Sequence, residues 1–344
     1  MIRPLILLLI LTFAKCHSAT VEPSHDQIAA FSNSIAMVFS DSFVAAYDIV
    51  GDMTDTVPGK PIYHLLCAAV AHAEMLDAED FSRERVFFGH VDTSVDLLEK
   101  WEKENPDDAW GQFFLGTAHG YKSVLYAQKK SWLKSLVAGL KAKGKFKKAI
   151  EIDPALYDAY TGMGNYHYWS TVKLRKYIPF LPNNRDKGIL ELKLAVDSSL
   201  FSSLPARAGL AWALIQEKEY KQAIEIGRRM EEETGGGRNS LWILGGAYWR
   251  TGNLNLAADY YSRLIDSFNA TGNQNYYNLI FCGYRRGVCY FKMGRLKEAM
   301  RDFETILSYE TSKKVKKRHK ETFERTEDYL GKIEKIFKDK EKSL

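Results

Sequence analysis

Apolar residues recur at three- and four-residue spacings along much of this chain, in short runs that alternate with turn-forming residues. The stretch 241–264 shows the pattern most clearly, because Leu241, Leu244 and Tyr248 fall on one side of a helix. Gly252 can adopt the left-handed conformation that ends a helix, and a second apolar stripe follows it. We therefore predict a helical hairpin here. Such a hairpin cannot bury its own apolar stripes, so it needs neighbours of the same build.

Four further stretches repeat this order of residue types, with small residues early and apolar or aromatic residues after them. Their marking residues are Leu115, Gly116, Ala142, Phe146 and Ala149; Tyr160, Met163, Gly164, Gly188 and Leu192; Leu210, Ala211, Leu214 and Ala223; and Gly287, Tyr290, Gly294, Ala299 and Phe303. Together the five units span residues 109–307. This repetition resembles the tetratricopeptide repeat family, whose unit is a helix–turn–helix of about 34 residues.

The resemblance implies an all-α fold, an α-solenoid in which helix–turn–helix repeats form a right-handed superhelix. Two adjacent units are expected to have elongated helices. Gly116 and Ala142 lie 26 positions apart and Gly164 and Gly188 lie 24 apart, whereas the matching residues of the 241–264 unit lie 12 apart. If the excess is shared between both helices, each gains nearly two turns and the tips project from the solenoid. The apolar residues of these tips then either pack on one another or form a surface.

The first residues of the chain have the pattern of a secretion signal. Arg3 precedes an uninterrupted apolar run at 5–14, which is too short to span a bilayer comfortably. We expect residues 1–19 to be removed from an exported protein of bacterial type, either periplasmic or secreted. Cys16 also allows a lipid anchor, but Lys15 stands where a small residue is expected, which disfavours lipidation.

Two segments flank the predicted repeats. Residues 20–108 carry helical periodicity at 26–53, 61–76 and 87–104, and we interpret them as degenerate repeats that cap the N-terminal end. Residues 308–344 are strongly charged, yet apolar residues still fall on one face. They predict a capping helix with a polar outer side.

Charge is unevenly distributed along the chain, whose net charge is +5. Nine lysines and no acidic residue lie between Gly116 and Glu151. This one-sided stretch predicts a partner or surface of opposite sign, a solvated face, or attraction to the acid-rich segment 74–108. Nucleic acid is disfavoured as a partner because the chain is expected to be exported and its charges are mixed.

The sequence offers little support for catalysis. We expect Cys67, Cys282 and Cys289 to be buried thiols, since the last two lie seven positions apart on one helix, about 10 Å along its axis. His119 and His167 fall at packing positions. No phosphate-binding loop and no residue spacing typical of a metal site are found, so we predict no enzyme activity, no metal and no cofactor.

In the tetratricopeptide repeat family, the first helix of each unit lines the concave surface, and inward positions stand at fixed offsets from its small residue. The resemblance therefore places a set of largely aromatic residues in a groove. They are Trp110, Phe113, Tyr121, Asn165, Tyr168, Trp169, Trp212, Trp242, Trp249, Arg250, Tyr284, Phe291 and Lys292. Five of the seven tryptophans lie among them, which favours a binding surface, because aromatic residues dominate binding hot spots. Any single ring can instead pack between neighbouring helices.

Two functional hypotheses follow from this groove. The first is a non-enzymatic scaffold or adaptor of the cell envelope that binds a protein or an extended peptide. The second is a periplasmic carrier of an apolar small molecule, which requires an enclosed cavity rather than an open groove. Membrane association is compatible with the sequence but is not predicted from it.

Overall fold

A computed structural model of the protein describes residues 20–52, 60–176, 180, 182–272 and 275–342. The predicted signal peptide, with Cys16 inside it, lies outside the described residues. Within these ranges the regular secondary structure is entirely helical. None of the described helices is both long and apolar enough to span a lipid bilayer.

Sixteen helices follow one another along the described part of the chain. They are α1 (His25–Phe39), α2 (Phe43–Gly51), α3 (Lys60–Ala78), α4 (Glu84–Glu104), α5 (Ala109–Gln128), α6 (Trp132–Ile152), α7 (Asp158–Leu174), α8 (Arg185–Ser198), α9 (Ser203–Gln216), α10 (Tyr220–Glu233), α11 (Arg238–Thr251), α12 (Leu254–Ala270), α13 (Tyr276–Lys292), α14 (Leu296–Ser308), α15 (Lys313–Arg318) and α16 (Lys320–Lys342).

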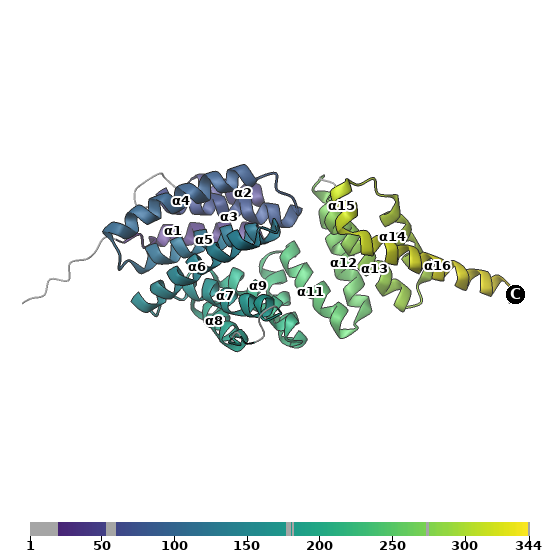
Figure 1. Ribbon diagram of the computed structural model, residues 1–344. Coiled ribbons are helices and arrows are strands. Elements are labelled where there is room, and N and C mark those ends of the chain that lie inside the picture. The colour runs from purple at the N-terminus through teal and green to yellow at the C-terminus, as the bar shows by residue number, and fades with distance from the viewer. Residues whose placement is uncertain (1–19, 53–59, 177–179, 181, 273–274, 343–344) are drawn as a thin grey trace, which may run out of the picture.

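Consecutive helices pair into hairpins, and the hairpins stack into an elongated array (Figure 1). From α5/α6 to α13/α14 there are five hairpins, which confirms the predicted solenoid. The second helix of each hairpin packs on the first helix of the next, and α5, α7, α9 and α11 also contact one another in turn. Because the inside of a curved stack brings helices closest together, these contacts put the first helices on its inner side.

The turn between α11 and α12 shows how local sequence makes a hairpin. Gly252 ends α11 in the left-handed conformation, with φ of 77°, which glycine adopts without a steric penalty. The side chain of Asn253 then accepts a hydrogen bond from the backbone N–H of Leu256 and caps α12. Tyr260 and Tyr261 of α12 lie directly over Gly245, so the small residue brings the two helices together.

Two N-terminal hairpins, α1/α2 and α3/α4, stack on α5 with the same order of contacts as the repeats. The helix expected over 26–53 is broken in two, because Ser40–Ser42 form a turn in which Asp41 has a positive φ of 61°. A non-glycine residue in this conformation ends regular helix.

The start of the described chain lies against the beginning of α5. The buried carboxylate of Asp108, which caps α5, accepts hydrogen bonds from Thr20 Oγ1 at 2.8 Å and from the backbone N–H of Val21 at 3.0 Å. Phe31 of α1 packs edge-to-face on Phe114 of α5 and on Phe201, which precedes α9. The first hairpin is thus held by the third as well as by its neighbour in sequence.

A buried arginine joins the N-terminal hairpins to the fourth repeat. The guanidinium of Arg238, at the start of α11, donates to both carboxylate oxygens of Asp77 at 2.7 Å, and its backbone N–H donates to Asp41 at 2.8 Å. Asn275 and Asn278 of the next repeat donate side-chain hydrogen bonds to the carbonyl oxygen of Asp77. The end of α3 therefore contacts two hairpins that are remote in sequence.

The expectation of two elongated units is half right. Helices α5 and α6 have 20 and 21 residues, against 14 each in α9 and α10. Helices α7 and α8 have only 17 and 14, so the extra length of that unit lies in the connection between them. Pro179 and Pro182 fall in this connection, and proline disfavours continuation of a helix.

The C-terminal cap consists of two helices rather than one. The short α15 precedes α16, and His319 stands between them. The inner side of α16 packs on α13 and α14, with Ile333 fully buried.

The three described cysteines are free and buried, as expected. Burial raises the pKa of the Cys289 thiol to about 12 and also raises the pKa of Cys282 and Cys67. These thiols therefore stay protonated at neutral pH and are poor nucleophiles.

A close helix crossing supplies the first prediction. A Cβ on Gly188 of α8 would lie 2.7 Å from the carbonyl oxygen of Gly164 on α7. Gly188→Ala should therefore force the helices apart and lower the free energy of unfolding by about 2–4 kcal/mol. Gly89→Ala is the control, because its Cβ meets nothing within 4 Å, and it should stabilise by about 0.5–1 kcal/mol. Equal effects of both changes in urea unfolding would refute the close approach.

The folded state should lose stability in acid because of a buried histidine, which gives a second prediction. His72 is buried between Phe87 and Tyr121, and burial lowers its pKa from 6.5 to about 4. The unfolded chain takes up this proton below pH 6.5 and the native chain only near 4. The free energy of unfolding is therefore unaffected by this group above pH 6.5. It falls as the pH drops from 6.5 through 4, by up to about 3 kcal/mol in total.

Replacing His72 with Phe, an aromatic residue that cannot take up a proton, should flatten this loss. Urea unfolding at pH 7 and pH 4.5 measures it, and His119 will leave a residual slope, because burial lowers its pKa to about 4 as well. An unchanged difference between the two pH values in His72→Phe would show that His72 is not the sensitive group.

Candidate functional site

The accessible part of the predicted groove lies on α9, α11 and α13. Trp212 of α9 and Trp242 and Trp249 of α11 are each partly exposed, and Arg250 and Lys292 are exposed. These residues come from the first helices of three successive repeats. They form the candidate site.

Trp249 is flanked by two cations from the next repeat. The guanidinium of Arg285 lies 4.6 Å from the centre of its ring and the ammonium of Lys292 lies 5.1 Å from it. Both distances are typical of cation–π contacts, which fix the orientation of the indole. The aromatic side chain is therefore presented in a defined position on a rigid helix.

Phe281 extends this arrangement toward the start of α13. Its ring is 36% exposed and lies edge-to-face on Trp242, with the centroids 5.6 Å apart. Arg285 lies over it at 5.2 Å, and so bridges Phe281 and Trp249. We call Trp242, Phe281, Arg285, Trp249 and Lys292 the aromatic–cationic face.

The positive charge of this face is not neutralised internally. Among the described residues, no acidic side chain forms an ion pair with Arg250, Arg285 or Lys292; Arg250 donates a hydrogen bond to the carbonyl oxygen of Gly246 at 3.0 Å. Arg286, the neighbour of Arg285, instead pairs with Asp302 away from the rings. A face with uncompensated cations attracts carboxylates.

Sequence reasoning missed Phe281 and Arg285. Phe281 stands six places before Gly287, the same offset that selects Trp110 before Gly116, so the pattern held a signal for it. Arg285 stands two places before Gly287 and fits no such offset. Only its packing against rings of two helices reveals it.

Three residues expected in the groove are buried instead of open. Trp110, Phe113 and Tyr168 are 7%, 4% and 0% exposed. Phe201 stacks on Trp110 with the ring centroids 6.1 Å apart, and the hydroxyl of Tyr168 lies 2.9 Å from the carboxylate of Glu217. These side chains therefore pack between repeats instead of facing an open groove.

Three more residues from the long units are partly buried. Tyr121 packs on His72, and Trp169 lies edge-to-face on the buried Tyr168. Asn165 donates a hydrogen bond to the carbonyl oxygen of Thr161 at 2.9 Å and contacts the position where Gly209 lacks a side chain. Its amide is thus engaged within the stack.

The last two, Tyr284 and Phe291, are partly covered by the C-terminal cap. Tyr329 of α16 lies 6.4 Å from Tyr284 and 4.9 Å from Phe291, measured between ring centroids. The row that the sequence predicts on α13 therefore contacts α16.

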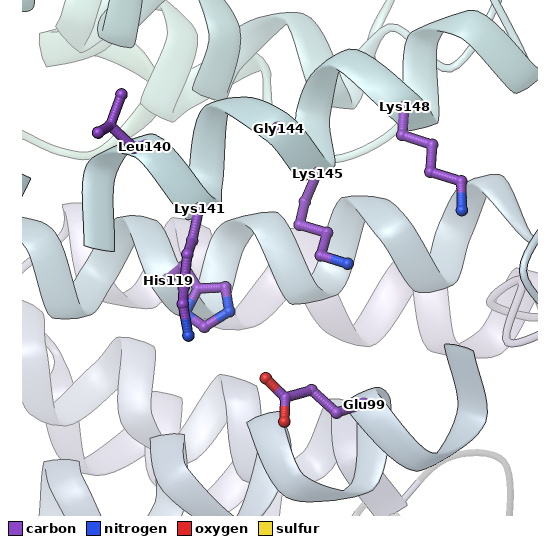
Figure 2. A pocket seen from close by; sticks show the side chains of 7 residues that line it. All are labelled: Glu99, His119, Leu140, Lys141, Gly144, Lys145 and Lys148. Carbon is purple, nitrogen blue, oxygen red and sulfur yellow. The ribbon is translucent and has the colours of Figure 1, made fainter. Parts of the chain in front are cut away.

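A separate, cationic cavity of about 420 Å³ lies between α4, α5 and α6 (Figure 2). Figure 2 shows Lys141, Lys145 and Lys148 of α6 along one side and Glu99 of α4 opposite them. Burial and the nearby Lys141 lower the pKa of His119, which also lines it. Leu140 and Gly144 complete the lining.

Much of the lysine-rich stretch is paired with the acidic residues that precede it. Lys122 binds Asp92 at 2.7 Å, Lys129 binds Glu84, and Lys145 binds Glu102. Internal attraction thus explains a good part of the charge asymmetry. Within the described residues, no group of three or more metal-binding side chains is arranged to hold a metal ion.

Comparison with known proteins adds one match within the sequence. The tetratricopeptide repeat family model matches residues 282–310, which run from within α13 to just past α14. No curated protein matches the chain.

Several solved structures are similar in fold at low sequence identity. PilW, described as a widely conserved type IV pilus biogenesis factor, is 14% identical, with a TM-score of 0.48, and the match covers 72% of this chain and 97% of PilW. A tetratricopeptide repeat protein from Parabacteroides merdae is 14% identical with a TM-score of 0.40, covering 88% and 99%. The C-terminal part of another from Cytophaga hutchinsonii is 15% identical with a TM-score of 0.44, covering 83% and 97%.

The chain folds as five stacked helical hairpins with small residues at several crossings. The α13/α14 hairpin is similar in sequence to the tetratricopeptide repeat family.

Proposed function

We propose that this chain is a non-enzymatic scaffold that binds an extended segment of another protein on the aromatic–cationic face. The observation that carries the proposal is Trp249, whose ring contacts the cations of both Arg285 and Lys292 and remains partly exposed. A preformed aromatic surface costs little ordering entropy when a partner binds. Aromatic and arginine side chains are also those that most often dominate interfaces.

The chemistry of the face specifies the kind of segment. Its rings favour apolar or aromatic anchors, and the unpaired charges of Arg250, Arg285 and Lys292 favour carboxylates beside them. We therefore expect a peptide in which acidic and large apolar residues alternate closely. An export signal at 1–19 would place this interaction in the cell envelope, and residues 20–108 and 308–344 would act as the two ends of the solenoid.

The carrier hypothesis draws less support. An apolar small molecule needs an enclosed, largely apolar cavity. The cavity in Figure 2 is lined by lysines, His119 and Glu99, and it lies away from the aromatic–cationic face. The open arrangement of the rings suits a chain-like partner better.

Selection from a random peptide library tests the proposal. Peptides with acidic and aromatic residues should be enriched by the wild-type chain and should bind Trp249→Ala/Lys292→Glu at least 30-fold more weakly, as expected for about 2 kcal/mol at two hot-spot positions. Lys335→Glu is the matched control, because it reverses an exposed charge on α16. Circular dichroism and thermal unfolding check that all variants fold.

Two results would count against the proposal. Enrichment of peptides without acidic residues would contradict the charge argument. Undiminished binding by the double variant would move the site elsewhere. The Trp242→Ala/Trp249→Ala pair extends the test, and unfolding of that variant would mean that these rings serve the core instead.

A further inference from the structure

Helix α6 exposes an apolar stripe to solvent. Trp132, Leu133, Leu136, Val137 and Leu140 are 63%, 76%, 44%, 50% and 52% exposed. They fall at successive one- and three- or four-residue steps along the first half of the helix, so they share one side. A contiguous apolar surface of this kind marks a site of interaction with a protein or a membrane.

The tip of the next unit does not cover the stripe. Phe180, the apolar residue described there, is 88% exposed, so it is not buried against α6. Phe180 and the apolar residues of α6 are thus both open to solvent. The α6 stripe has no occupant within the described chain.

Lysines border the stripe without direct ion pairs, and one of them, Lys141, also lines the cavity opposite Glu99. Lys130 and Lys141 are exposed, and Lys134 lies over the ring of Tyr126. Among the described residues, none of the three forms an ion pair, whereas Lys122, Lys129 and Lys145 do. The excess positive charge of this region therefore gathers beside the exposed apolar residues.

We propose that α6 docks on an anionic membrane surface, with its apolar stripe in the interface and Lys130, Lys134 and Lys141 on lipid phosphates. Helices that lie in the plane of a membrane combine leucine and tryptophan on one face with lysine at its edges. Tryptophan favours the boundary between acyl chains and headgroups. An acidic protein surface would also attract the lysines. A protruding stripe with an exposed tryptophan, however, inserts more easily into a fluid membrane surface than into the preformed groove of a protein.

This placement is compatible with partner binding. Helix α6 is the second helix of its hairpin and lies on the outer side of the stack, whereas the aromatic–cationic face belongs to first helices. A membrane-bound chain would thus keep that face free. The proposal stands independently of the proposed function, since it uses none of the same residues.

Flotation of the full chain with lipid vesicles tests the inference. Residues 20–344 should float with vesicles of phosphatidylcholine and phosphatidylglycerol, and much less with phosphatidylcholine alone. Lys130→Gln/Lys134→Gln/Lys141→Gln should lower the partition coefficient roughly tenfold or more, since each lysine near an anionic surface contributes attraction. The control Lys317→Gln/Lys335→Gln/Lys338→Gln removes the same charge elsewhere and should have little effect.

A second pair of variants isolates the apolar contribution. Leu133→Gln/Leu136→Gln changes only solvent-exposed side chains, so the fold should persist, and flotation should fall about tenfold. Val44→Gln, at a residue 75% exposed on α2, is its control and should float normally.

Three outcomes would overturn the proposal. They are equal flotation with both vesicle types, equal loss in the lysine variant and its control, and a wild-type dimer in solution that the leucine variant dissociates. The last would make a second copy the occupant of the stripe.

Discussion

A helical hairpin of this size exposes apolar surface on two sides, and only another hairpin on each side can remove that surface from water. This constraint accounts for the stacked array, because each second helix packs on the next first helix. It also explains the small residues at crossings such as Gly164 and Gly188, where a side chain would collide with backbone. The hairpins at the two ends of the stack still expose apolar surface, which the terminal segments have to cover. Helix α16 covers one end, with Ile333 in the core.

The N-terminal hairpins do more than close the other end. Asp77 and Arg238, 161 positions apart, form a bidentate ion pair in which the arginine side chain is 5% exposed. Burying such a charge is costly unless it is fully hydrogen-bonded, so the pair specifies how α3 meets α11. At the beginning of α5, Phe31 packs on Phe114 and Phe201 packs on Trp110. The exposed residues of the predicted groove, Arg250 and Lys292, lie instead on α11 and α13.

Rules that depend on neighbouring residues, such as helix ends and close helix crossings, predicted much of the fold from the sequence. Gly252 and the small residue at 245 were enough to predict a hairpin, because helix ends and close crossings depend on residues near one another in the chain. The burial of Trp110 could not be predicted, since its cover comes from a loop after α8. Arg285 was missed for a related reason: its role comes from rings on two helices, which no spacing within α13 encodes. The excess length in the second long unit was recognised, but its assignment to helices was wrong.

We propose that the cations of α13 hold Trp249 of α11 in place as a binding surface for an acidic, partly apolar peptide. Photo-crosslinking tests this binding most directly. A peptide selected by the wild-type chain, carrying a photoreactive group beside its aromatic anchor, should form adducts on α11 and α13 that are identifiable by mass spectrometry. Adducts confined to the outer side of α6, or spread evenly over the chain, would contradict the account.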